Sequence, residues 1–155
     1  MTYIGIDPGI SGAMAIVYGD PALRPYAFPF DEEDYVSTMR DLVAFEAERR
    51  GAVKAVVEHV HSMPKQGVAS SFKFGQNFGW ILGALSAIGI SYELVNPQKW
   101  KREFSCTSDK NTSIAVARRM FPDVSLLATP KCRKPHDGMA EALLMAEYCR
   151  RRGRA

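Results

Sequence analysis

Acidic residues stand at the ends of apolar segments at three widely separated places in this chain. Asp7 ends the apolar run 3–6, and Glu58 ends a second run that is rich in β-branched residues. Asp137 and Glu141 stand near the start of a C-terminal segment with helical periodicity. A carboxylate at the edge of a core is costly unless a cation or a hydrogen-bond donor meets it. The fold must therefore supply these acids with a partner.

The composition fits an ordinary soluble fold. A chain of 155 residues with 46% hydrophobic residues can bury a core, and we expect a single domain spanning 1–155. The apolar stretch 80–90 is too short to span a bilayer, and no signal peptide is evident at the N-terminus. Three widely spaced cysteines without a CxxC motif predict free thiols and a cytoplasmic location.

Charge is divided unevenly along the chain. Residues 1–62 carry 5 Lys/Arg against 10 Asp/Glu, whereas residues 63–155 carry 15 against 7. A basic half beside an acidic one fits a polyanionic partner that is gripped next to a carboxylate site. A solvated surface of mixed charge would give the same counts.

The order of the predicted elements indicates a fold class. We expect a five-stranded mixed sheet flanked by helices, with three antiparallel strands first and parallel strands after them, which is the element order of the RNase H-like fold. The predicted strands are 2–7, 13–18, a short one within 23–28, 52–58 and 92–95, and the predicted helices are 32–50, 69–88, 97–101, 109–120 and 136–152.

Glycines recur in the predicted helix 69–88. Gly75, Gly79 and Gly83 are spaced four residues apart and leave a smooth face that another backbone can approach closely. A dimer contact and packing on the sheet both fit this pattern. The aromatic residues Phe78 and Trp80 of the same helix are expected in the core or an interface rather than as platforms for base stacking.

The last predicted helix carries two acids on its inward stripe. At about 100° per residue, Asp137 and Glu141 share a face with Leu144 and Tyr148. Acids four residues apart repel each other unless a cation lies between them. The alternative is that they are solvated and favoured by the helix dipole.

Four carboxylates that converge predict a metal centre. An oxygen-only donor set suits Mg²⁺ or Mn²⁺, and two such ions about 4 Å apart can activate water for in-line attack on a phosphodiester. Asp7 is the candidate to bridge both ions because its strand is expected at the centre of the sheet. Glu58, Asp137 and Glu141 would complete the coordination.

Six segments, in order along the chain, carry a resemblance to a known family. They are IGIDPG at 4–9 with Gly12 after it, VVE at 56–58 with residues 59–63 after it, FKFGQNFG at 72–79, VNPQKWK at 95–101, Asp109-Lys110, and HDGMAEALL at 136–144. Together they resemble the RuvC family of Holliday-junction resolvases, and in particular its phage-type members, over nearly the whole chain.

The resemblance implies a metal-dependent endonuclease. Members of that family are homodimers that bind four-way DNA junctions and make paired nicks with 5′-phosphate and 3′-hydroxyl ends. Their catalytic carboxylates correspond to Asp7, Glu58, Asp137 and Glu141, and Lys101 and Lys110 lie near the positions of basic residues at the scissile region. A phage-encoded member would act in the cytoplasm of its host.

The chain departs from the bacterial pattern at two places. Bacterial members space their last two acids at i, i+3 and use aspartate at both, whereas Glu141 follows Asp137 at i, i+4. Direct metal binding by Glu141 therefore stays open. Bacterial members also place an aromatic wedge after the second acid, where this chain has His61 and Met63.

Further basic residues are candidates for contact with DNA. Lys131, Arg133 and Lys134 interleave with proline in a predicted loop next to the last helix, and we expect them to meet phosphate. His61 is a candidate for DNA contact as well. His136 would either contact water or the leaving group, or cap the last helix.

Three other functions compete with junction resolution. Another branched-DNA or RNA nuclease of the same fold would use the same acids. A nucleic-acid-binding module without catalysis would not need them, because acids near phosphate repel DNA when no metal is bound. An actin-like nucleotide switch shares the style of the first turn but needs a second lobe, for which 155 residues leave no room.

Overall fold

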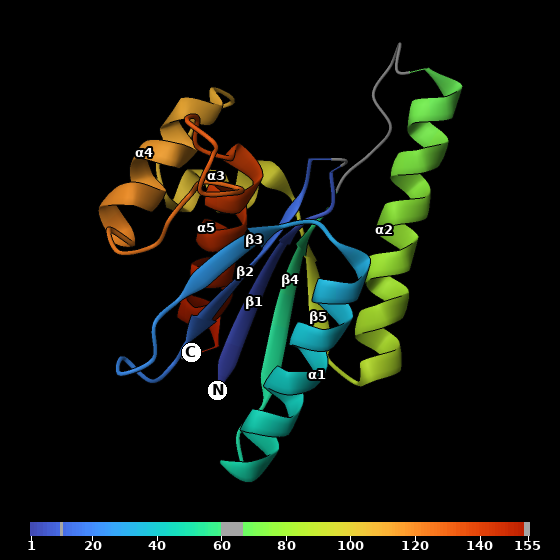
Figure 1. Ribbon diagram of the computed structural model, residues 1–155, viewed down its shortest axis with the longest axis vertical. Coiled ribbons are helices and arrows are strands. Elements are labelled where there is room, and N and C mark those ends of the chain that lie inside the picture. The colour runs from blue at the N-terminus through green and yellow to red at the C-terminus, as the bar shows by residue number, and fades with distance from the viewer. Residues whose placement is uncertain (10, 60–66, 154–155) are drawn as a thin grey trace.

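The computed structural model describes residues 1–9, 11–59 and 67–153. These residues form one mixed sheet with helices on both of its faces (Figure 1). The strands are β1 (Thr2–Asp7), β2 (Ala13–Tyr18), β3 (Tyr26–Pro29), β4 (Val53–Glu58) and β5 (Ser91–Val95). The helices are α1 (Glu32–Glu48), α2 (Val68–Ile88), α3 (Pro97–Glu103), α4 (Lys110–Met120) and α5 (Asp137–Arg152).

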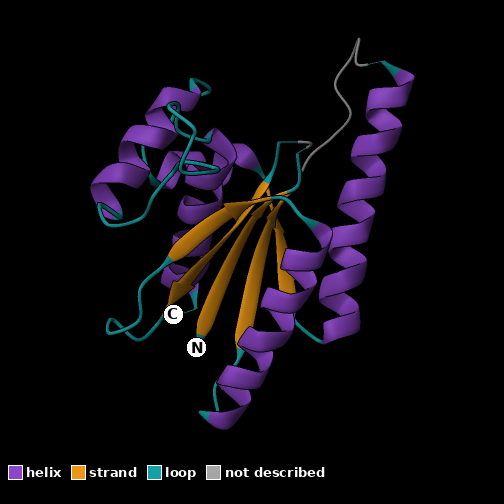
Figure 2. Cartoon of the chain, viewed as in Figure 1, coloured by secondary structure: helices purple, strands orange, loops and turns teal. Residues whose placement is uncertain are grey.

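The sheet has the order β3-β2-β1-β4-β5, which places β1 at its centre. β1, β2 and β3 are antiparallel neighbours, and β4 is parallel to both β1 and β5. The predicted mixed sheet is therefore confirmed. Because β1, β4 and β5 run the same way, their carboxyl ends meet at one edge (Figure 2). The pairing of Ile6 with Val57 brings the next residues, Asp7 and Glu58, level at that edge.

The third strand ends one residue beyond the predicted range 23–28. β3 spans Tyr26–Pro29 and is an edge strand of the sheet, paired with β2. Pro29 is its last residue and lies opposite Ala13. An edge strand tolerates proline because one of its sides has no partner that needs an N–H group.

Helix α5 lies against the sheet on one side and against α3 and α4 on the other (Figure 1). Residues 138–149 are consequently all buried, so the helix is enclosed on every face and not only on the predicted inward stripe. Gly5 permits this packing, because a Cβ atom there would overlap the backbone of Ala142 and Ala146. Close contact with the central strand fixes the position of α5 on the sheet.

Helices α1 and α2 cover the other face of the sheet (Figure 1). Tyr35 and Met39 of α1 and Ile81 and Leu85 of α2 are fully buried in the core cluster on that side. Phe78 and Trp80 pack against the same cluster. None of the helices in the described part of the chain is long and apolar enough to cross a membrane.

The glycines of α2 do not face the sheet. A Cβ atom added to Gly75, Gly79 or Gly83 would meet nothing within 4 Å, and all three residues are exposed. Of the two alternatives for these glycines, packing on the sheet is therefore excluded. Their face of α2 points away from the rest of the described chain.

Candidate active site

Asp7 is held at the end of the central strand by a tight turn. Its Oδ1 atom accepts a hydrogen bond from the N–H of Gly9 at 3.0 Å. The N–H of Gly12 donates to the Gly9 carbonyl at 2.8 Å, and a Cβ atom on Gly12 would overlap the carbonyl oxygen of Asp7. The glycines of the first motif therefore allow the turn to fold back on the carboxylate.

Asn77 of α2 braces the same turn from the opposite face of the sheet. Its Nδ2 atom donates to the carbonyl of Pro8 at 2.9 Å and lies 3.3 Å from that of Gly9. Sequence analysis did not identify this residue. A half-buried amide directly before the apolar run 78–85 is the signal that could have found it, because such a group needs a hydrogen-bond partner.

Glu58 is buried at the end of β4, where 8% of its surface remains exposed. Its Oε1 atom accepts a hydrogen bond of 3.0 Å from the indole Nε1 of Trp100, a fully buried residue of α3. A buried indole N–H nearly always finds an acceptor. Trp100 therefore orients Glu58, a role that the sequence did not show.

The start of α5 lies directly on the turn that follows Asp7. A Cβ atom on Gly138 would be 2.7 Å from the carbonyl oxygen of Ser11 and 3.1 Å from Oδ2 of Asp7. His136 caps the helix, because its Nδ1 atom accepts from the N–H of Met139 at 3.2 Å. This bond supports the structural one of the two roles considered for His136.

Two lysines meet the acids of α5. Lys101 of α3 places its Nζ atom 2.9 Å from Oε1 of Glu141, and the hydroxyl of Ser113 lies 3.4 Å from the same oxygen. Lys110, the first residue of α4, pairs with Oδ2 of Asp137. The fold thus brings both predicted lysines to the acidic edge, where each is paired with a carboxylate.

The pKa of Asp7 is raised mainly by burial and further by its acidic neighbours. Burial raises it to about 7; the hydrogen bond from Gly9 acts against this, whereas the charges of Glu58 and Glu141 add to it. Burial also raises the pKa of Glu58, against the hydrogen bond from Trp100, and Glu141 raises it further. Three acids from three separate elements therefore lie within electrostatic reach of one another.

Asp137 lies at the margin of this cluster. Burial alone would raise its pKa, but the hydrogen bond and the charge of Lys110 outweigh that effect and lower it. Its side chain is 30% exposed, whereas that of Glu141 is 7% exposed. The structure therefore places Glu141, whose spacing departs from the bacterial pattern, deeper in the cluster than Asp137.

The donor chemistry of the site fits a hard divalent cation. The acids offer only oxygen, and burial raises the pKa of Asp7 by more than the Gly9 hydrogen bond and the charge of Lys110 lower it. Within residues 1–9, 11–59 and 67–153, however, no group of three His, Cys, Asp or Glu side chains is arranged to hold one ion. Lysine ammonium groups contact Glu141 and Asp137 instead.

The basic loop leads directly into the site. Lys131, Arg133 and Lys134 are exposed between α4 and α5. The N–H of His136 donates to the carbonyl of Leu126 at 2.7 Å and ties the end of this loop down beside Asp137. The remaining candidate for DNA contact, His61, lies outside the described residues.

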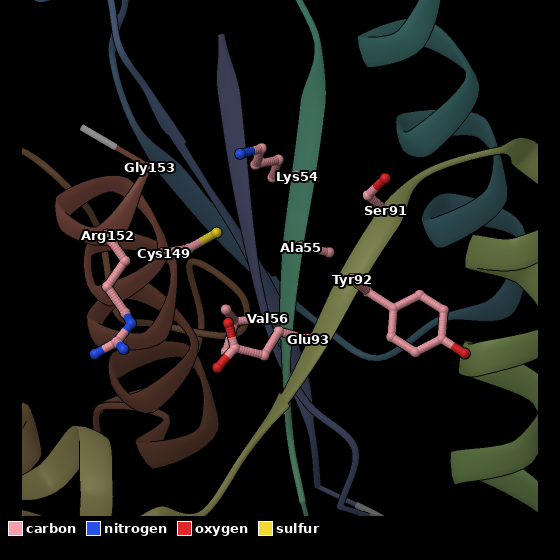
Figure 3. Close-up of a pocket in the computed structure, with 9 residues that line it drawn as sticks. All are labelled: Lys54, Ala55, Val56, Ser91, Tyr92, Glu93, Cys149, Arg152 and Gly153. Atoms are coloured by element: carbon pink, nitrogen blue, oxygen red, sulfur yellow. The ribbon is translucent and has the colours of Figure 1, made fainter. Parts of the chain in front are cut away.

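A cavity of about 230 Å³ lies apart from the acidic edge (Figure 3). It opens along the first halves of β4 and β5 and beside the C-terminal turn of α5, at the opposite ends of these elements from Glu58 and Asp137. Its lining contains none of the predicted site residues and consists of Lys54, Ala55, Val56, Ser91, Tyr92, Glu93, Cys149, Arg152 and Gly153.

Comparison with solved structures identifies the fold as RuvC-like. The chain is similar to Thermus thermophilus RuvC in complex with a Holliday junction substrate, with 19% identity and a TM-score of 0.55 over 94% of this chain and 90% of that one. It is also similar to another Thermus thermophilus RuvC structure, with 20% identity and a TM-score of 0.55 over 99% of this chain and 97% of that one. No protein-family model and no curated protein matches the chain. The similarity shows the RNase H-like fold.

Substitution Asp7→Asn should stabilise the metal-free protein in a pH-dependent manner. The folded-state pKa is about 7 and the ordinary value is 3.8, so the folded state binds more protons between these values and loses stability as pH rises through them. We expect the free energy of unfolding of the variant to exceed that of the wild type by on the order of 4 kcal/mol at pH 8 and by little at pH 4.

Urea unfolding at several pH values in the presence of EDTA measures this difference. Asp123→Asn, at an exposed position outside the site, is the matched control and should change nothing. If the Asp7→Asn variant gained the same free energy of unfolding at pH 4 and at pH 8, the raised pKa of Asp7 would be contradicted.

Proposed function

We propose that the chain is a divalent-metal-dependent endonuclease that resolves four-way DNA junctions. The observation that carries the proposal is the meeting of Asp7, Glu58 and Glu141 at one edge of the sheet, where burial first and then the charges of Glu58 and Glu141 raise the pKa of Asp7. A structurally similar RuvC is described in complex with a Holliday junction substrate, which supports a junction as the substrate.

The acids would hold the metal, and the basic residues would hold the DNA. Mg²⁺ or Mn²⁺, two ions per active site, would supply Lewis-acid activation of water and of the scissile phosphate when bound. Asp7, Glu58, Asp137 and Glu141 would hold the ions through their carboxylate oxygens. Lys101 and Lys110 stand beside them, where their ammonium groups can reach a phosphate.

Positioning rests on contacts within the chain. Asn77 and Gly9 hold the turn that carries Asp7, and Trp100 holds one oxygen of Glu58 by a hydrogen bond. Hydrolysis in line would leave a 5′-phosphate and a 3′-hydroxyl. Exposed Lys131, Arg133 and Lys134 would bind backbone phosphates on either side and set the register of the DNA.

We further propose that the protein acts as a homodimer through α2. The outward face of this helix is apolar and uncharged: Val68 is 88% exposed and Phe72 is 66% exposed, and Gly75, Gly79 and Gly83 continue the face. An exposed apolar patch of this kind marks an interaction surface. Two copies would place two acidic edges on one junction and allow paired cuts.

Cleavage of a synthetic four-way junction tests the function. We expect paired symmetric nicks with 5′-phosphate ends in Mg²⁺ or Mn²⁺ and none in EDTA. Glu58→Gln should lower the cleavage rate by on the order of 10²–10³-fold while junction binding persists, because the missing charge acts on the metal and not on the DNA backbone. Asp123→Asn is the control at an exposed acid outside the site.

The substrate panel decides between the competing nucleases. Flap, duplex and RNA substrates should be cut much more slowly than the junction. Faster cleavage of a flap or of RNA would assign the site to a different nuclease of the same fold. Junction binding without any cleavage in either metal would favour a non-catalytic binding module.

Substitution Gly79→Arg should separate the dimer. Gly79 is exposed at the middle of the α2 face and has open space around it in one chain, so an arginine there can be accommodated in a monomer but not between two closely packed helices. Sedimentation equilibrium should give twice the chain mass for the wild type and the single mass for the variant. Ala44→Arg, at an exposed position of α1, is the control, and a Gly79→Arg protein that remains dimeric would exclude this face.

A further inference from the structure

The two site acids of α5, Glu141 and Asp137, are paired with lysines that come from other helices. Lys101 extends from α3 to Glu141 with only 19% of its side chain exposed, and Lys110 extends from the first position of α4 to Asp137. The sequence separations are 40 and 27 residues, so these pairs are products of the tertiary fold and not of helical spacing.

The position of Lys110 is unfavourable for α4 itself. A cation at the first residue of a helix faces the positive end of the helix dipole, and the first turn of α4 contains no acid. Asp109 caps the helix by accepting from the N–H of Asn111. The charge of Lys110 is therefore matched across the site by Asp137 rather than within its own helix.

Within the described residues, neither of the two strand acids of the site forms an ion pair with a lysine. The Oδ1 atom of Asp7 accepts a hydrogen bond from the Gly9 N–H, and the Oε1 atom of Glu58 accepts one from the Trp100 indole. Both lysines form their ion pairs with acids of α5, although the charge of Lys110 also reaches Asp7 and the charges of both lysines reach Glu58. A cation that bridges the strand acids to α5 would bind carboxylates that the lysines now contact.

We propose that Lys101 and Lys110 act as built-in counter-cations, which hold Glu141 and Asp137 until a divalent ion displaces them. This inference rests on the proposed metal site. Metal and lysine then compete for the same carboxylates, so each lysine weakens metal binding, and each ammonium group that is displaced becomes available to a phosphate. Once the metal is bound, both ammonium groups are free to bind phosphates of the DNA.

Binding of Mn²⁺, measured by the electron paramagnetic resonance signal of the free ion, tests the competition without any cleavage. Lys110→Met keeps the length of the side chain, removes its charge, and lies at a 65% exposed side chain, so the fold should tolerate it. We expect the variant to bind Mn²⁺ about 3–10-fold more tightly than the wild type, and Lys101→Met to do the same.

Two controls locate the effect. Lys99→Met removes an exposed charge two residues from Lys101 on the same helix, from a side chain that forms no ion pair within the described chain, and should leave the affinity unchanged. Asp7→Asn should weaken Mn²⁺ binding in every background, which assigns the bound ion to this edge. Urea unfolding in EDTA verifies that each variant is folded.

The outcomes separate this inference from the proposed function. Mn²⁺ binding that depends on Asp7 but is equal or weaker in both lysine variants would overturn the competition and leave the proposed metal site intact. Mn²⁺ binding that is tighter in Lys101→Met and Lys110→Met but not in Lys99→Met supports competition between lysine and metal. The absence of Mn²⁺ binding in the wild type and in every variant would overturn both proposals.

Discussion

The burial of three carboxylates at one edge of the sheet is the constraint on which the candidate site depends. Asp7, Glu58 and Glu141 come from the central strand, its parallel neighbour and the helix packed upon them. Burial and the other two acids together raise the pKa of Asp7 to about 7. A fold keeps such a cluster only where something positive offsets it. In this chain the offset comes from lysines on α3 and α4 and, in our proposal, from divalent ions.

Close packing of α5 on β1 makes the cluster possible. Gly5 allows the helix backbone to touch the central strand, and Gly138 allows its first turn to lie on the turn after Asp7. The carbonyl brace from Asn77 holds the same turn from the opposite face of the sheet. Strand β1, the turn after Asp7, and helices α2 and α5 are therefore packed together where the acids meet. The positions of the acids consequently depend on packing in the core.

The acids could be predicted from the sequence because their positions conflict with local rules. A charged residue that ends an apolar strand, as Asp7 and Glu58 do, is visible without a structure, and parallel pairing then places both at one edge. The lysine pairs and the Trp100–Glu58 hydrogen bond could not be predicted, because they join helices whose relative placement depends on tertiary packing. The deeper burial of Glu141 than of Asp137 could not be predicted for the same reason, because it depends on tertiary packing and not on the spacing of the two acids.

Anomalous diffraction from crystals soaked in Mn²⁺ tests the central claim most directly. The account predicts anomalous peaks at the edge where β1 and β4 end, about 2.1 Å from carboxylate oxygens of Asp7 and Glu58, with the ammonium of Lys101 moved away from Glu141. Anomalous peaks confined to other acids, with Asp7 and Glu58 uncoordinated, would contradict it.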